Sequence, residues 1–340
     1  MKPKISIIEV ARHAGVSKST VSRVIADSGG SVSPRALEKV LAAIKDLGYT
    51  KNTLAAGLRS QKTWMILVMV PDIANPYWSE IARAAQDRLE AEGFSVVVGN
   101  TDWLEAREAR YFDLARSGRF DGMVINSVTD DIAMIHRMGI PVVLVGERAE
   151  VQDIDTVGTD TIMATRLALE YLWTTGHRRI GIATSEHGSE RFLSFRRRTY
   201  EGFLAEKGVA PDPGIVFSVK LSDEGGRDLA RGLLALDGWR SRVDAIFCGN
   251  DILAIAAMDA LREAGVEAGN DISLVGLDDI PAAANTRPAL TTVRKPRTLI
   301  GAAAAELLLA RIRDPDRPPE KRLFPGELII RGSVMERHTI

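Results

Sequence analysis

The sequence predicts an α/β protein in which a small helical head precedes a body made of two lobes of parallel, doubly wound sheet. Three observations lead to this fold class. From Met65 onward, short apolar runs alternate with amphipathic stretches. Basic residues are concentrated in the first 62 positions. A length of 340 residues suits about two domains with a small module added.

Composition excludes several classes of protein. The chain is 45% hydrophobic and 26% charged, which is ordinary for a globular protein. The longest apolar run, Trp64–Val70, ends at Pro71 and is far shorter than the ~20 residues that span a bilayer. No apolar secretory stretch follows Met1, and Cys248 is the only cysteine. We therefore expect a soluble, cytoplasmic protein without membrane partner, disulfide or cysteine-based zinc site.

The near-neutral total charge of −1 conceals a strong asymmetry. Residues 1–62 hold 11 basic and 4 acidic side chains, a net +7, whereas the remaining 278 residues carry a net −8. Such a split indicates a nucleic-acid-binding module on an acidic body. A solvated basic helical face would give the same charge, so spacing has to decide between the two.

The head shows start and stop signals for three helices. Ser6 and Glu9 occupy capping-box positions, and Gly15 provides the positive φ that a tight turn needs. Ser17 is placed to cap a second helix, with Val21, Val24 and Ile25 inward. A third helix begins at Ser33-Pro34, ends at Gly48, and should bury the apolar residues Leu37, Val40, Leu41, Ile44 and Leu47. Two helices joined by a glycine turn form a helix-turn-helix unit.

The outer face of the second predicted helix carries groups that bond DNA. Lys18, Ser19 and Arg23 are the candidates for contacts with base edges in the major groove. Thr20, Ser22 and the other lysines and arginines of the head are the predicted phosphate contacts, and the cap residue Ser17 completes the predicted DNA-binding set. The alternative is a three-helix bundle that binds no ligand.

Eight apolar runs of the body predict strands, and they are too many for one small sheet. The runs are Met65–Val70, Ser95–Val98, Gly122–Ile125, Val142–Val145, Ile180–Ala183, Ile215–Phe217, Ala245–Phe247 and Ile272–Val275. Amphipathic stretches such as Ile81–Ala91, Ala164–Thr174 and Ile252–Ala264 separate them. Ligands bind beyond the carboxyl ends of parallel strands, where this chain places polar residues such as Asn126, Asn250 and Asp278. With the flat rings of Tyr77 and Trp78, this set predicts a cleft for a small polyhydroxylated ligand.

The head resembles the N-terminus of the lactose-repressor/galactose-repressor (LacI/GalR) family. The resemblance rests on residues 8–24, IEVARHAGVSKSTVSRV, and on Leu47-Gly48-Tyr49 followed by residues 52–59, NTLAAGLR. In that family the second segment is a hinge helix that enters the minor groove beside its dimer mate. By position, Leu58 would be the wedge between central base pairs, Ala55 its neighbour, and Asn52 and Arg59 nearby anchors. Lys51 stands where the family usually has proline.

Further family landmarks follow in order through the body. They include residues 70–78, VPDIANPYW, and 176–180, GHRRI, then Asn250-Asp251, residues 275–279, VGLDD, and 288–293, PALTTV. The resemblance implies a body like periplasmic sugar-binding proteins, with three crossings between lobes. It implies effector contacts from Tyr77, Trp78, Asn250 and Asp278.

Two departures from the family concern the ligand. The family's effector-binding arginine falls at Thr199, so one of Arg196, Arg197 and Arg198 is the candidate replacement; Arg197 and Arg198 enter our predicted site. Leu221 stands where purine-responsive members have an aromatic residue, which favours a mono- or disaccharide over a purine.

No catalytic or metal-binding motif is apparent. The phosphate-loop, dinucleotide and nucleophile-elbow motifs are missing, and the five histidines lack metal-ligand spacing. Asp278 and Asp279 resemble paired carboxylates, but adjacent strand residues point to opposite faces. We expect no catalytic residue, no metal and no cofactor. A sugar-active enzyme and a plain sugar-binding module remain the alternatives, and the basic head argues against both.

Together these observations predict a sugar-responsive transcriptional regulator, most simply a repressor, that binds a palindromic operator as a homodimer. Only seven residues follow Ser333, which is too few for a tetramer-forming heptad tail. The expected division is a head at 1–50, a hinge at 51–62 and a body at 63–340. Within the body, we expect one lobe at about 63–162 and 291–323, and the other at about 163–290 and 324–340.

Overall fold

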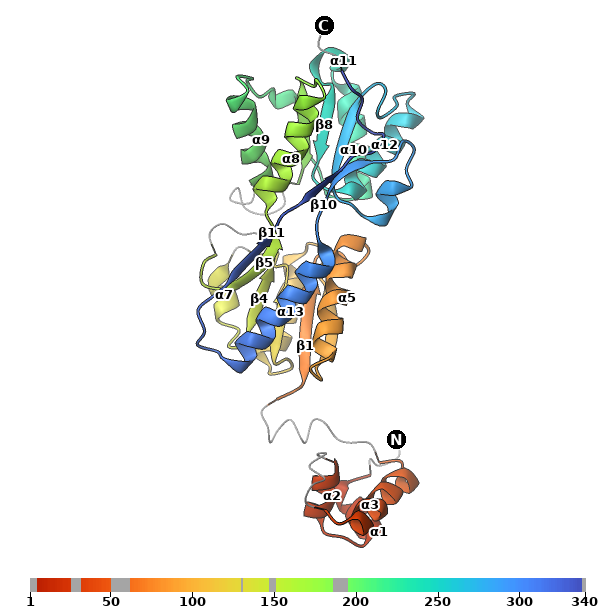
Figure 1. Ribbon diagram of the computed structural model, residues 1–340, viewed down its shortest axis with the longest axis vertical. Helices are drawn as coiled ribbons and strands as arrows, with labels where there is room; N and C mark the ends of the chain where they lie inside the picture. Colours follow the sequence, from red (N-terminus) through yellow and green to blue (C-terminus); the bar gives the residue numbers. More distant parts are fainter. Residues whose placement is uncertain are drawn as a thin grey trace. The chain divides into compact units, whose positions relative to one another are not determined.

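The computed structural model describes residues 5–25, 32–49, 62–129, 131–146, 151–185 and 195–337. The chain divides into two compact units, Met1–Thr63 and Trp64–Ile340, which correspond to the predicted head and body. Figure 1 shows the helices and strands of each unit.

The head contains the three predicted helices, α1 (Ile7–Ala14), α2 (Lys18–Ile25) and α3 (Pro34–Leu47). Ser6 and Glu9 form the reciprocal capping box of α1, and Gly15 ends that helix at a φ of 64°. Ser33 caps α3, which ends at Gly48. The helix-turn-helix prediction from spacing is confirmed.

The core of the head is smaller than the sequence suggested. Val10, Val21, Val40 and Ala43 are buried in it. Leu41 is 52% exposed, so the expectation that it is buried was wrong. One residue along a helix is a turn of about 100°, which takes Leu41 off the stripe that Val40 and Ala43 define. Leu37, also expected to be buried, is 36% exposed in the first turn of α3.

The first lobe of the body is built on a wholly parallel six-stranded sheet. Its strand order is β11-β5-β4-β3-β1-β2. The strands are β1 (Met65–Val70), β2 (Ser95–Asn100), β3 (Gly122–Ile125), β4 (Val142–Val145), β5 (Asp155–Thr159) and β11 (Lys321–Phe324). Helices α5 (Pro76–Glu90), α6 (Glu105–Arg116), α7 (Ile132–His136) and α13 (Arg297–Arg313) cover it. Alternate residues of β1 pack against α5 and α13 on one face and against α6 and α7 on the other.

The second lobe contains the other six-stranded sheet, ordered β12-β10-β9-β8-β6-β7. Its strands are β6 (Ile180–Thr184), β7 (Val216–Ser218), β8 (Ala245–Cys248), β9 (Ser273–Asp278), β10 (Thr291–Arg294) and β12 (Glu327–Ile329). Only β12 pairs antiparallel in this described sheet. Helices α8 (Thr161–Thr174) and α9 (Phe195–Glu206) cover one face, and α10 (Asp223–Ala235) and α12 (Asp251–Glu263) cover the other. The short α11 (Trp239–Arg242), η2 (Pro213–Ile215) and η3 (Pro281–Ala284) complete the lobe.

The chain crosses between the lobes three times, as expected, but one boundary was misplaced. The crossings follow β5, β10 and β11 (Figure 1). We expected residues from 291 onward to belong to the first lobe. Instead, Thr291–Arg294 pairs with β9 of the second lobe, because backbone hydrogen bonds extend that sheet by one more parallel strand. The second crossing therefore comes after Arg294.

All eight expected strands are present, with shifts of a few residues at their ends, whereas β5, β10, β11 and β12 were not anticipated. β5, β10 and β11 are rich in Thr, Asp, Lys and Arg, so no apolar run marks them, and β12 is only three residues long. Within the described residues, no helix has the length and apolar character that crossing a membrane requires.

Candidate DNA-binding surface and effector site

The outer face of α2 presents the predicted DNA-contacting side chains to solvent. Lys18, Ser19 and Arg23 are exposed, and Thr20 and Ser22 are half-buried. The hydroxyl of Ser17 accepts a hydrogen bond from the backbone N–H of Thr20 at 3.1 Å. It also lies 2.7 Å from the Ser19 hydroxyl and 2.8 Å from the Thr20 hydroxyl. This hydroxyl cluster orders the first turn of the helix, the end that a recognition helix directs at base edges.

The predicted hinge contacts Asn52, Ala55, Leu58 and Arg59 lie outside the described residues, as does Lys51. Their roles remain predictions from the family resemblance.

The body brings four polar or aromatic side chains together where the two lobes meet, and we call them the inter-lobe cluster: Tyr77, Arg196, Asp278 and Lys295. The Lys295 ammonium lies 2.9 Å from Asp278 Oδ1 and 4.3 Å from the centre of the Tyr77 ring. Arg196 is close enough for its charge to act on both Tyr77 and Asp278. Tyr77 follows β1 and Asp278 ends β9, so the carboxyl ends of both sheets contribute to the cluster.

Asp278 and Asp279 bind different partners: Asp278 pairs with Lys295, and Asp279 pairs with Arg294 and Arg331. Strand alternation does not account for this, because β9 ends at Asp278. Both aspartates have positive φ, 126° and 55°, an uncommon conformation for residues other than glycine. Arg297 Nη1 donates hydrogen bonds of 2.7 Å to both backbone carbonyl oxygens. Arg297 is in turn held by Glu80 Oε2 at 2.7 Å. A side chain of the first lobe therefore fixes this loop of the second lobe.

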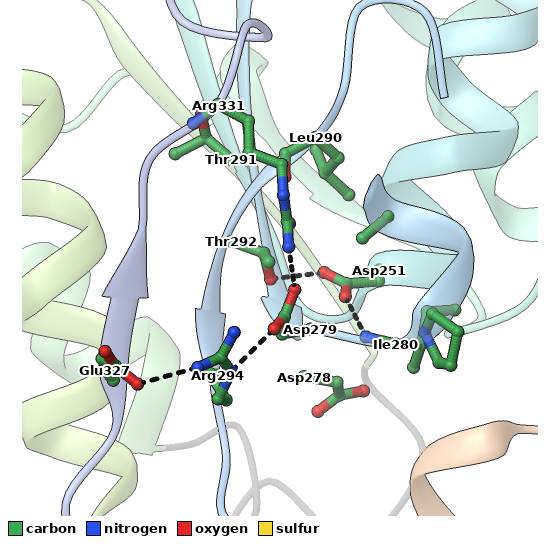
Figure 2. A network of polar contacts seen from close by, with 12 residues as sticks. Asp251, Asp278, Asp279, Ile280, Leu290, Thr291, Thr292, Arg294, Glu327 and Arg331 are labelled. Atoms are coloured by element: carbon green, nitrogen blue, oxygen red, sulfur yellow. Dashed lines mark hydrogen bonds and ion pairs between the residues drawn. The ribbon is translucent and has the colours of Figure 1, made fainter. Parts of the chain in front are cut away.

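The Asp279 carboxylate is directed toward β10 and the segment after β12, away from the inter-lobe cluster. It accepts hydrogen bonds from Arg294 Nε at 2.8 Å and Arg331 Nη2 at 2.6 Å. Arg294 also binds Glu327 at 3.1 Å (Figure 2). Burial alone would raise the pKa of Asp279, but the bonds from Arg331 and Arg294 lower it below its usual value. The network ties the Asp278 loop to β10 and to the segment that contains β12.

Asp251, the first residue of α12, also binds the segment that contains Asp278 and Asp279. Its Oδ1 accepts a 2.5 Å hydrogen bond from the Thr292 hydroxyl, and its Oδ2 accepts a 2.9 Å bond from the Ile280 N–H (Figure 2). Burial, followed by the neighbouring Asp278 charge, raises the pKa of Asp251 to about 7. Asn250 caps α12 through Leu253 and donates to the Leu221 carbonyl at 3.1 Å, so its side chain braces the loop around β8.

Among the three consecutive arginines, Arg196 is the one that joins the inter-lobe cluster. Arg197 forms an ion pair with Glu201 at 2.9 Å, one turn along the helix. Arg198 is exposed and lies 5.4 Å from the Phe195 ring centre. The structure therefore does not bring the two predicted arginines to Asp278. Burial lowers the pKa of Arg196, against the opposing effect of the Asp278 charge.

The other predicted site residues lie at the expected edge of the first lobe. Trp78 packs edge-on against Tyr77, with ring centres 4.8 Å apart, and stands 6.5 Å from Trp103. Asn126, just after β3, donates to the Val145 carbonyl at 2.7 Å, while its buried Oδ1 lacks a hydrogen-bond partner among the described residues. Lys295 was missed because it follows a strand that carries no apolar signal. The charged run Arg294-Lys295-Pro296-Arg297, directly after a family landmark, was the available clue.

The five histidines and the single cysteine were not expected to bind a metal. No group of three or more His, Cys, Asp or Glu side chains suited to a metal is found in the described ranges. Cys248 is fully buried, and burial raises the pKa of its thiol, as a core-packing role predicts.

A helix-turn-helix head joined to a two-lobed body with polar groups at the lobe junction defines a class of DNA-binding regulators with a small-molecule-binding body. Comparisons identify the family. Residues 6–52 match the model of bacterial regulatory proteins of the lacI family, and residues 169–334 match a periplasmic binding protein-like domain. The HTH-type transcriptional regulator DegA of Bacillus subtilis (strain 168) is 30% identical, covering 99% of this chain and 100% of DegA. The chain belongs to the LacI family.

A second relative and two solved structures extend the comparison. The ribose operon repressor of Halalkalibacterium halodurans is 32% identical, covering 97% of each chain. The lac repressor dimer bound to operator and the anti-inducer ONPF is 27% identical over 98% of this chain and 100% of that one, with a TM-score of 0.85. A LacI family regulator from Enterococcus faecium with bound ribose is 28% identical, covers 81% of this chain and 100% of that one, and has a TM-score of 0.70. This protein is accordingly a DNA-binding transcriptional regulator of a family whose members are not enzymes.

Proposed function

We propose that this protein is a sugar-responsive transcriptional repressor that binds a palindromic operator as a homodimer. One observation carries the sugar half of the proposal: polar groups of both lobes converge at their junction, and two of their atoms are buried without a hydrogen-bond partner among the described residues. These atoms are Arg196 Nε, in the inter-lobe cluster, and Asn126 Oδ1, at the end of β3. Buried polar atoms normally have partners, so these two favour a ligand that supplies them. The ribose-bound E. faecium relative supports the same class of ligand.

The DNA half of the proposal assigns base contacts to Lys18, Ser19 and Arg23, with Ser17, Thr20 and Ser22 at the phosphates. Two copies related by a two-fold axis match a two-fold symmetric site. The lac repressor relative, a dimer bound to operator, supports this arrangement. Leu58, the proposed minor-groove wedge, gives a further test: Leu58→Ala should weaken operator binding while non-specific binding barely changes.

Control of DNA binding would come from the junction of the lobes. An effector that bridges Asn126 of the first lobe and Asp278 of the second changes the relative stability of lobe arrangements. Asp279 links the same loop through Arg294 to the crossing strands, so a change at Asp278 reaches the segments that connect the lobes. Differential affinity for two arrangements is what shifts their populations.

A thermal-shift screen against sugars, sugar phosphates, polyols and purines tests the proposal, because a ligand that binds the folded protein raises the melting temperature. A sugar that raises it and also changes operator affinity in fluorescence anisotropy is the expected outcome. A purine that does both, with all sugars inactive, would replace the proposed effector class. Equal operator affinity with every ligand that binds would refute the regulatory mechanism.

A further inference from the structure

The inter-lobe cluster holds more positive than negative charge. Two cations, Arg196 and Lys295, face a single carboxylate, Asp278, which Lys295 already engages at 2.9 Å. The buried Nε of Arg196 has no hydrogen-bond partner in the part of the chain that the structure describes. A buried N–H that lacks a partner is costly, because it loses its hydrogen bond to water and gains none in exchange.

The other carboxylates around this loop are engaged elsewhere. Asp279 is bound by two arginines of the crossing segments, Arg294 and Arg331. Glu80 pairs with Arg297, which leaves that pair neutral. Asp251 accepts from a hydroxyl and a backbone N–H and does not contact a cation in the described residues. None of these three described acids faces Arg196, so the excess positive charge of the cluster is not compensated by them.

We infer that the effector carries an anionic group, a carboxylate or a phosphate, which binds between Arg196 and Lys295. This inference rests on the proposed function and names the chemical class of the sugar as an acidic one. A guanidinium matches a carboxylate or phosphate with two parallel hydrogen bonds, and an ammonium with three donors can serve Asp278 and the ligand together.

A neutral sugar would satisfy hydrogen bonds but would leave the extra cation enclosed when the lobes surround it. An anion completes both the hydrogen bonds and the charge balance. The directions of the pKa shifts agree with this argument: burial raises the pKa of Asp278 and lowers that of Arg196, so burial disfavours the charged form of each group.

Calorimetric titration of the full-length protein with matched sugars tests the inference. The pairs are glucose with glucuronate and glucose 6-phosphate, galactose with galacturonate, and ribose with ribose 5-phosphate, all at fixed ionic strength. We expect at least one acid to bind tenfold or more tightly than its neutral parent. The carboxylate and phosphate arms identify which anion the site prefers.

Substitutions then locate the anion. Arg196→Gln should weaken binding of the preferred acid at least tenfold and change the affinity of the neutral parent less than twofold. Lys295→Gln should act in the same direction. Arg231→Gln, an exposed arginine of α10, is the charge-matched control and should leave both affinities unchanged. Melting curves without ligand verify that each variant is folded.

Two results would overturn the inference. One is a neutral sugar that binds as tightly as its acid; the other is equal weakening of acid and neutral sugar by Arg196→Gln. If a neutral sugar alone binds and alters operator affinity, the inference fails and the proposed function stands. If an acid binds as expected but no sugar alters operator affinity, the anion site is supported and the proposed regulation fails.

Discussion

The buried carboxyl of Asp251 makes the stability of the body depend on pH in a way that one substitution should abolish. Its folded-state pKa of about 7 lies well above the ordinary value of 3.8. The folded protein therefore keeps a proton that the unfolded chain has already lost. The stabilisation from this group is complete below pH 3.8 and is lost as the pH rises through 7.

The magnitude follows from the size of the shift. Each unit of pKa difference corresponds to about 1.4 kcal/mol. At pH 5.5 the solution is about 1.5 units below the folded pKa, so raising the pH to 8.5 should remove about 2 kcal/mol of unfolding free energy through this group. Asn at position 251 can accept from the Ile280 N–H and donate to the Thr292 hydroxyl, which preserves both hydrogen bonds without a charge.

Denaturant unfolding of the wild type and Asp251→Asn at pH 5.5, 7 and 8.5 measures the effect. Relative to the wild type, the variant should gain about 2 kcal/mol between the lowest and highest pH. Asp259→Asn, an exposed carboxyl on the same helix, should follow the wild-type profile. Parallel pH profiles of the wild type and Asp251→Asn would refute the assignment of a raised pKa to Asp251.

Three further substitutions probe packing, the loop and the head. Gly301→Ala places a Cβ against the backbone oxygen of Ile81 in α5, so α13 must move. The free energy of unfolding, measured with denaturant, should fall by about 1–3 kcal/mol. The control Leu299→Ala, at a 57% exposed position, should change it little. Asp279→Ala leaves Arg331 without its carboxylate and Arg294 with Glu327 alone, and should lower the unfolding free energy by about 3 kcal/mol. A loss below about 0.5 kcal/mol would contradict the network's role. Lys18→Ala should weaken binding to the operator more than binding to random duplex, whereas Lys39→Ala should weaken both equally. If the two variants behave identically in anisotropy titrations, Lys18 does not contact a base.

Local signals predicted the head and most of the fold because local chemistry determines those features. A capping box, a glycine turn and a proline at the first helical position are each short-range, and the structure contains all of them. Apolar runs located eight of the strands, six of them inside a sheet, where buried parallel strands are apolar on both faces.

The features of the fold and site that the sequence did not predict depend on contacts between residues distant in the sequence. Thr291–Arg294 is a strand because β9 and β12 provide hydrogen bonds on both sides, and its own composition gives no sign of this. The choice of Arg196 over Arg197 and Arg198 depends on which arginine reaches a carboxylate 82 positions later, Asp278. Lys295 enters the cluster only because the second crossing brings it beside Tyr77.

The central claim is that a sugar controls binding of this protein to a two-fold symmetric DNA site. Selection of bound duplexes from a random double-stranded library, repeated with and without the ligand found by thermal shift, tests it most directly. We predict a palindromic consensus whose occupancy by the protein changes at least tenfold when the sugar is added. An asymmetric consensus, or equal occupancy in both conditions, would contradict the account.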